Sequence, residues 1–141
     1  MRIRLASIND FEALCAIDSS AATCAERSGQ IRRWLETACC WVYEINAQIS
    51  AYGVLTQHFF GQPFIEMVMV GQKFRRQGMG AAIISHFQAT ASGAKLFSST
   101  NMSNRTMQRL LTRQGFKPSG YIDNLDEGDP EIIFYCPLTR R

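Results

Sequence analysis

A basic, glycine-containing segment in the middle of the chain has the residue types of an anion-binding site. Lys73, Arg75 and Arg76 cluster within four residues, and Gly78 and Gly80 follow. Glycine lets a diphosphate approach the backbone closely, and an arginine can pair with a phosphate in bidentate fashion. If a helix begins at about Gly78, the N–H groups of its first turn also favour an anion. On these residues alone, a phosphate site and a basic loop that only packs closely are equally good interpretations.

The spacing of this segment separates it from two common phosphate-binding motifs. No Gly-Lys-Ser/Thr follows, as a Walker loop would require, and the three-glycine dinucleotide fingerprint is absent. Residues 75–80 instead resemble the pyrophosphate loop of the GNAT N-acetyltransferase superfamily, whose pattern is Arg/Gln-x-x-Gly-x-Gly/Ala. Upstream, the family often reads apolar-x-Val-x-Pro-x-aromatic-Arg, and only the proline position departs from that pattern. The residues at these upstream positions are Val68, Val70, Gln72, Phe74 and Arg75.

A second motif of the same family lies downstream, in the expected order and at the expected separation. The family pattern is Asn-x-x-Ala-x-x-Leu-Tyr-x-x-x-Gly-Phe, which this chain matches with two departures. The corresponding residues are Asn104, Met107, Leu110, Leu111, Gly115 and Phe116. Leu111 stands where many relatives have a tyrosine that acts as the general acid, and leucine cannot donate a proton.

The resemblance implies acetyl-CoA as the donor substrate and assigns residues to it. The backbone of Val68, Met69 and Val70 would pair with the amides of the pantetheine arm. Asn104 would hydrogen-bond the same arm near the thioester. The diphosphate would be held by the loop and helix start that follow the strand: Arg75, Arg76, Gln77, Gly78, Met79, Gly80 and Ala81.

Catalysis of acetyl transfer to an amine needs a base that leaves the nucleophile neutral. Glu66 is the best candidate, because it is the lone charge in an apolar strand and burial would raise its pKa towards a useful range. The alternative is a structural carboxylate. For the general acid, Tyr121 and Tyr135 could approach from the closing strands, with Tyr121 the speculative choice. A thiolate with a pKa near 8.5 could also leave without a strong acid.

The elements that must position these residues follow from hydrophobic spacing, capping and turn residues. Asn9 is the expected N-cap of the first helix, and a second helix should extend to Ala38. A helix from about Gly78 to Ala91 should open at the glycine loop, and one over 104–114 should end before a left-handed Gly115. Strands are expected at residues 3–6, 41–45, 49–59, 64–70, 95–99, 116–122 and 131–136.

The order of these elements, β-α-α-β-β-β-α-β-α-β-β, predicts a mixed α/β fold. Together with the motifs it implies a GNAT-like fold, in which about four helices flank a mostly antiparallel sheet of six to seven strands. With 141 residues and no visible linker, the chain is expected to form one domain, residues 1–141.

The composition limits the other classes of function. A net charge of +3 is too small to indicate nucleic-acid binding, and no apolar run approaches the roughly 20 residues that cross a bilayer. No secretory segment is visible, so a cytoplasmic location is the default expectation. No metal site is expected, because the cysteines form no CxxC pair and are predicted to be reduced, buried thiols. They are Cys15, Cys24, Cys39, Cys40 and Cys136.

The acceptor is the part that the sequence determines least. The acidic residues between 123 and 131 could attract a cationic amine, or they could be a solvated loop. We therefore expect an N-acetyltransferase that acts on a primary amine, most simply that of a small cationic molecule. A protein or peptide amine and a non-catalytic acyl-CoA-binding module are the alternatives. Dimers are frequent among similar proteins, and the apolar closing strands could support a homodimer.

Overall fold

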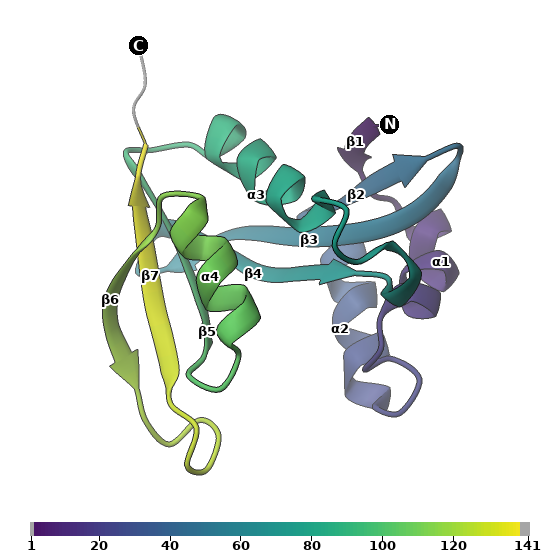
Figure 1. Ribbon diagram of the computed structural model, residues 1–141. Coiled ribbons are helices and arrows are strands. Elements are labelled where there is room, and N and C mark those ends of the chain that lie inside the picture. The colour runs from purple at the N-terminus through teal and green to yellow at the C-terminus, as the bar shows by residue number, and fades with distance from the viewer. Residues whose placement is uncertain (1, 139–141) are drawn as a thin grey trace. The chain divides into compact units, whose positions relative to one another are not determined.

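Residues 2–138 are described by a computed structural model, in which helices and strands follow the predicted order (Figure 1). The strands are β1 (Arg2–Leu5), β2 (Cys40–Ile45), β3 (Gln48–Phe59), β4 (Gln62–Val70), β5 (Lys95–Asn101), β6 (Lys117–Ile122) and β7 (Glu131–Pro137). The α-helices are α1 (Phe11–Ile17), α2 (Ala25–Glu36), α3 (Met79–Thr90) and α4 (Arg105–Arg113). Two short 3₁₀ helices, η1 (Ile8–Asp10) and η2 (Gln72–Phe74), precede α1 and α3.

The strands form one sheet in the order β1-β2-β3-β4-β5-β7-β6. The pairs β1–β2, β2–β3, β5–β7 and β6–β7 are antiparallel. In contrast, β4 and β5 are parallel, with Phe64 opposite Phe97 and Ile65 opposite Ser98. The predicted mixed α/β class with a mostly antiparallel sheet is therefore confirmed, and the sheet of the described residues has seven strands, within the six to seven expected. The chain divides into two compact units, one of residues up to Leu55 with Met67–His86, the other of Thr56–Glu66 with the residues from Phe87 on.

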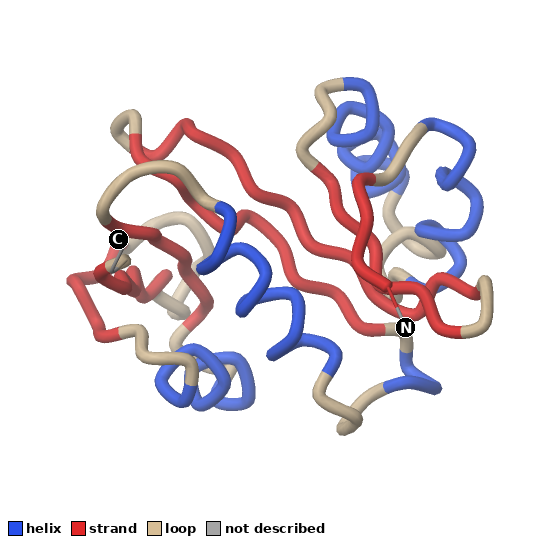
Figure 2. Tube along the Cα trace, turned by 90° about the horizontal axis from the view of Figure 1, so that it is seen from above, coloured by secondary structure: helices blue, strands red, loops and turns tan. Residues whose placement is uncertain are grey.

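The first unit has helices on both faces of its strands (Figure 2). On one face, α1 and α2 bury Leu14, Ile31 and Leu35 against Val42 and Tyr52. On the other face, where every second residue of β2 points, the ring of Trp41 lies 5.0 Å from that of His86 on α3. Each fully buried Leu or Ile side chain stabilises such a core by roughly 1.5–3 kcal/mol.

In the second unit, α4 begins and ends as its sequence predicts. Gly115 has a φ of 92° and donates its N–H to Thr112 at 3.1 Å, while Phe116 donates to Leu111 at 3.0 Å. These two bonds satisfy carbonyl groups that the helix leaves unpaired at its C-terminus. The left-handed position predicted for Gly115 is confirmed.

Several local predictions were wrong, and each has a local cause. Asn9 is not the N-cap of α1, because Asp10 accepts the N–H of Ser7 at 2.9 Å and closes η1 there. The second helix stops at Glu36, and Ala38 lies beyond it with a φ of 56°. This left-handed residue turns the chain into β2 within a few residues.

Burial also departs from expectation at two positions. Glu66 is exposed, although burial was expected for it as the lone charge in an apolar strand. Cys24 is exposed and Cys15 and Cys39 are only half-buried, so burial is confirmed for Cys40 and Cys136 alone; all five cysteines are free thiols. Between residues 2 and 138, no helix is long and apolar enough to span a membrane.

Candidate functional site

The loop between β4 and α3 is shaped by backbone conformations that only some residues accept. Gly71 ends the strand, and its N–H donates to the carbonyl of Ser50 at 2.8 Å. After η2, Arg75 is extended, and Arg76 and Gly78 have φ values of 65° and 82°. A Cβ atom on Gly78 would meet nothing within 4 Å, so this glycine is there for its conformation and for the open space beside it.

The charge of this loop is uniformly positive. Lys73, Arg75 and Arg76 are all exposed, and no acidic residue lies between Gly71 and Gly78. The Nε of Arg75 donates to the carbonyl of Val70 at 3.2 Å, which ties the loop to the end of β4. Since α3 begins at Met79, the loop charges and the positive end of the helix dipole lie next to each other in sequence. These residues fit an anionic group such as a diphosphate.

The residues of β4 that precede the loop belong to the same unit. Val68, Met69 and Val70 are half-buried. The side chains of Met67 and Met69 pack against the core beneath α1 and α2, so those of Val68 and Val70 point to the opposite face of the strand. The structure therefore gathers in the first unit every residue predicted to contact the donor except Asn104.

Three other predicted residues lie in the second unit, and each has a defined environment. Asn104 is the N-cap of α4, where its Oδ1 accepts the N–H of Met107 at 3.1 Å. Glu66 is exposed on β4, so the burial that favoured it as a base is not present. Tyr121 lies on β6 opposite Ile132 and is 64% exposed.

The second unit also contains Leu111, which stands at the family's usual general-acid position, and Tyr135, a candidate to replace that acid. Leu111 is buried at 1% exposure on the inner face of α4. The ring of Tyr135 lies 6.2 Å from that of Phe97, which in turn lies 5.1 Å from Phe59. Tyr135 thus belongs to an aromatic cluster that the sequence did not indicate, because its members come from three different strands.

Much of the acidic loop is fixed by hydrogen bonds within the second unit. Asp129 accepts the N–H of Ser103 at 3.0 Å and its hydroxyl at 2.6 Å. Asp126 accepts from Asn101 at 2.8 Å, and the carboxylate of Glu131 on β7 accepts from a serine on β5 at 2.6 Å. These partners were missed, since they are 25 to 32 residues away in sequence.

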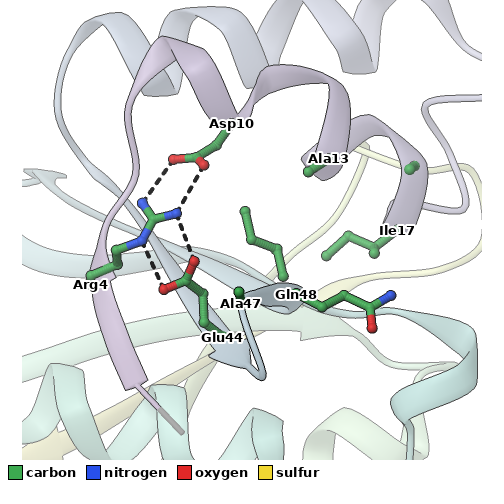
Figure 3. A pocket seen from close by; sticks show the side chains of 9 residues that line it. Arg4, Asp10, Ala13, Ile17, Glu44, Ala47 and Gln48 are labelled. Atoms are coloured by element: carbon green, nitrogen blue, oxygen red, sulfur yellow. Dashed lines mark hydrogen bonds and ion pairs between the residues drawn. The ribbon is translucent and has the colours of Figure 1, made fainter.

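A separate cavity of about 380 Å³ lies in the first unit, between α1 and the hairpin of β2 and β3 (Figure 3). One wall is an ion-pair network in which Arg4 donates to both oxygens of Asp10, at 2.9 and 3.0 Å, and binds Glu44 at 3.1 Å. The hydrogen bond from Arg4 lowers the pKa of both carboxyl groups. None of the residues predicted to bind acetyl-CoA lines this cavity. Its lining is Arg4, Asp10, Ala13, Ala16, Ile17, Glu44, Ala47, Gln48 and Ile49.

Among the described residues, no group of three or more His, Cys, Asp or Glu side chains could hold a metal ion.

Comparison with known proteins accounts for this combination of fold and loop. Residues 7–116 match the model of the acetyltransferase (GNAT) family. No curated protein matches the chain.

Several solved structures of similar fold are acetyltransferases. A GNAT-family acetyltransferase from Bacillus cereus is 33% identical, with 99% of this chain and 98% of that chain covered and a TM-score of 0.91. The ribosomal-protein-S18-alanine N-acetyltransferase from Escherichia coli is 19% identical, with 99% and 95% covered and a TM-score of 0.77. A Bacillus anthracis protein crystallised in complex with acetyl coenzyme A is 20% identical, with 71% and 62% covered and a TM-score of 0.65. The chain belongs to the acetyltransferase (GNAT) family, whose members use acetyl-CoA.

Proposed function

We propose that this protein transfers an acetyl group from acetyl-CoA to the primary amine of a small cationic molecule. The observation that carries the proposal is the turn from Arg75 to Gly78. It joins two exposed arginines and an open, left-handed glycine to the N-terminus of α3. Such a turn suits the diphosphate of CoA in charge and in backbone shape.

The donor is held by residues from both motifs. Backbone groups of Val68 to Val70 pair with the pantetheine amides, and N–H groups from Arg76 to Ala81 hold the diphosphate, with Arg75 supplying further charge. Asn104 contacts the pantetheine arm near the thioester. Because the Oδ1 of Asn104 caps α4, its Nδ2 group is the part that donates to the arm.

The acetyl group is activated for transfer as a thioester. Glu66 accepts the proton of the incoming ammonium, directly or through a water molecule, so that the amine attacks in its neutral form. A backbone N–H near Val70 stabilises the charge that develops on the carbonyl oxygen. With Leu111 in the core, the thiolate leaves without a strong acid, or with a proton from Tyr121.

The sign of the acceptor's charge is inferred from the acidic loop. Its exposed carboxylates, Asp123 and Glu127 among them, give the segment between β6 and β7 a negative charge that attracts a cation. A protein amine would fit the same charge, and a structurally similar enzyme acts on a ribosomal-protein alanine. The proposed function rests on the donor loop, and the choice of a small cationic acceptor rests on the charge of the acidic loop.

The donor site is tested by thermal unfolding with acetyl-CoA. At about 100 times the Kd, the ligand should raise the Tm of the wild-type protein by roughly 5–10 °C. Arg76→Glu should abolish most of this shift, because it places a negative charge beside the diphosphate, and Gly80→Glu should do so by filling the phosphate site. Arg33→Glu is the matched control, since Arg33 is an equally exposed arginine on α2. An undiminished shift in both loop variants would rule out this loop as the donor site.

The acceptor is tested by release of free CoA thiol across small amines, polyamines, aminoglycosides and peptides. We expect turnover with a small cationic amine. Turnover with peptides alone would favour the protein-amine alternative. Tight binding of acetyl-CoA without turnover in any arm would favour the non-catalytic module.

A further inference from the structure

A buried carboxylate lies at the end of α1, in the first unit and apart from the residues that contact the donor. The side chain of Asp18 is 0% exposed. Its oxygens accept from the hydroxyl of Tyr52 on β3, from Nη1 of Arg27 on α2 at 3.0 and 3.3 Å, and from the N–H of Ser20 at 2.8 Å. A carboxylate taken out of water is tolerated only when its lone pairs are satisfied in this way.

Tyr52 and Arg27 remain hydrogen-bond donors over the physiological range of pH. Burial and the hydrogen bond to Asp18 raise the pKa of Tyr52 far above neutrality, so its hydroxyl remains a donor. Burial lowers the pKa of Arg27, but the hydrogen bond and the charge of Asp18 outweigh that effect and raise it overall. The network therefore braces α1, α2 and β3 through the hydrogen bonds that Tyr52 and Arg27 donate to Asp18.

The end of α1 that this brace fixes lies against the start of the donor loop. Ile17, the residue before Asp18, approaches Gly71 so closely that a Cβ atom on the glycine would be 3.2 Å from its Cβ and Cγ2 atoms. The same Cβ would be 3.2 Å from the ring of Phe74. Gly71 has an ordinary φ of −57°, so the close space beside it, and not its conformation, favours glycine at this position.

A chain of direct contacts therefore leads from the buried carboxylate to the loop. Asp18 holds the end of α1, Ile17 packs on Gly71, and the carbonyl of Gly71 accepts the N–H of Phe74 at 2.8 Å. Arg75 follows directly and is bound back to Val70. A shift of the end of α1 would thus move the residues from which the basic turn starts.

We propose that Asp18 is a positioning residue for the donor loop, which it holds through Ile17 and Gly71. The inference rests on the proposed function of that loop in binding acetyl-CoA. Asp18 itself touches no substrate, and its effect is on how well the loop is preorganised for the diphosphate.

The main test is Asp18→Asn, which keeps the shape of the side chain and removes its charge. Calorimetry should show the Kd for acetyl-CoA raised roughly tenfold. Hydrogen exchange of the amides between Gly71 and Gly78 should become faster in the same variant, which reports the loop directly. Tyr52→Phe removes one hydrogen bond but leaves the ion pair, and it should show both effects more weakly. This second variant keeps the test decisive if the first does not fold.

The matched control is Leu35→Ala, which opens a cavity in the same core and lowers the Tm but removes none of the hydrogen bonds to Asp18. It should leave the acetyl-CoA Kd and the loop exchange unchanged. Gly71→Ala should mimic Asp18→Asn, and the double variant should be little worse than either one, because both act through the same contact.

The outcomes separate this inference from the proposed function. If the wild-type protein shows no affinity for acetyl-CoA, the donor loop itself fails. If the wild type binds acetyl-CoA and both variants at Asp18 and Tyr52 bind it equally well, only the positioning role is overturned. If Leu35→Ala lost as much affinity for acetyl-CoA as Asp18→Asn, the positioning role would also be overturned, because the loss would then reflect general stability alone.

Discussion

The carboxylate of Glu66 is exposed on β4, immediately before Met67, whose side chain packs into the core of the first unit. An exposed carboxylate keeps access to water, and it can pass a proton to solvent after each turnover. The role as base that we propose for Glu66 therefore does not rest on burial. A test of Glu66 should therefore measure how its contribution to kcat depends on pH.

At this scale we predict that Glu66→Gln lowers kcat by about 100-fold or more, the usual contribution of a general base. The Kd for acetyl-CoA should stay unchanged, because the side chain acts on the acceptor. The deficit should shrink as the pH rises towards the pKa of the amine, about 10 for a lysine-like group, since the acceptor then arrives neutral. Steady-state kinetics at several pH values, with Glu36→Gln as an exposed control, would measure this. A deficit of equal size at every pH would argue against a base.

Among the elements, α4 illustrates how one residue can serve stability and binding at once. The Oδ1 of Asn104 caps the helix, and its Nδ2 group is available in the proposal for the pantetheine arm. These two duties use different atoms of one amide. Two substitutions can therefore separate them.

We predict that Asn104→Ala lowers the free energy of unfolding by about 1 kcal/mol, the usual value of an N-cap, and also weakens acetyl-CoA binding. Asn104→Asp should keep the stability, because aspartate is an equally good cap and suits the N-terminal end of the dipole. It should still weaken binding, since it has no amide hydrogen to donate. Urea unfolding and calorimetry on the same samples would measure both. Unchanged affinity in the aspartate variant would exclude the amide contact.

The elements themselves were largely predictable, whereas their ends were not. Ile83, Ile84 and Phe87 recur at helical spacing, so α3 could be recognised from its own sequence. Ala38 also continues the helical spacing of α2, but the approach of the following strand ends the helix two residues earlier. Asp10, and not Asn9, is the N-cap of α1, because its carboxylate accepts the N–H of Ser7. A pattern of hydrophobic residues indicates which face of a helix is buried. It says little about the residue at which the helix ends, because that depends on local polar contacts.

For the molecule as a whole, the ion pairs of Arg4 make the free energy of unfolding depend on pH. The pKa values of Asp10 and Glu44 are lowered from ordinary values of 3.8 and 4.5, chiefly by hydrogen bonds from Arg4. A carboxyl group with a lowered folded-state pKa stabilises the fold above its ordinary pKa. That contribution is lost as the pH falls through the folded-state value.

We therefore predict that Arg4→Met destabilises the protein at pH 7 and that its deficit shrinks below about pH 4. Arg2→Met is the control, because Arg2 is mostly exposed and contacts only Glu44, at 3.3 Å, in the same network. It should give a smaller deficit. Urea unfolding at pH 7 and pH 3 would provide the comparison, and an equal deficit for Arg4→Met at both values would contradict it.

The candidate site was predictable where it is continuous in sequence and not where it depends on distant partners. Residues 68–81 form one strand, turn and helix start, so the local structure of the proposed donor loop could be predicted from its own sequence. The partners of Asp126 and Asp129 are on β5 and just after it, more than 20 residues away. The brace around Asp18 likewise joins α1, α2 and β3. Contacts of this kind follow from the completed fold, which a local pattern does not contain.

The edge strand β6 has a consequence for how copies of this protein can meet. All of its residues are exposed, yet Lys117 and Pro118 occupy its first half, and its register with β7 shifts between Pro118 and Tyr121. Proline offers no N–H, and an irregular edge aligns poorly with a straight one, so both features disfavour amyloid-like strand addition there. A homodimer that used this edge would pack more readily through the exposed side chains of Tyr121 on β6 and Leu125 in the loop that follows than by extending the sheet from one copy to the next.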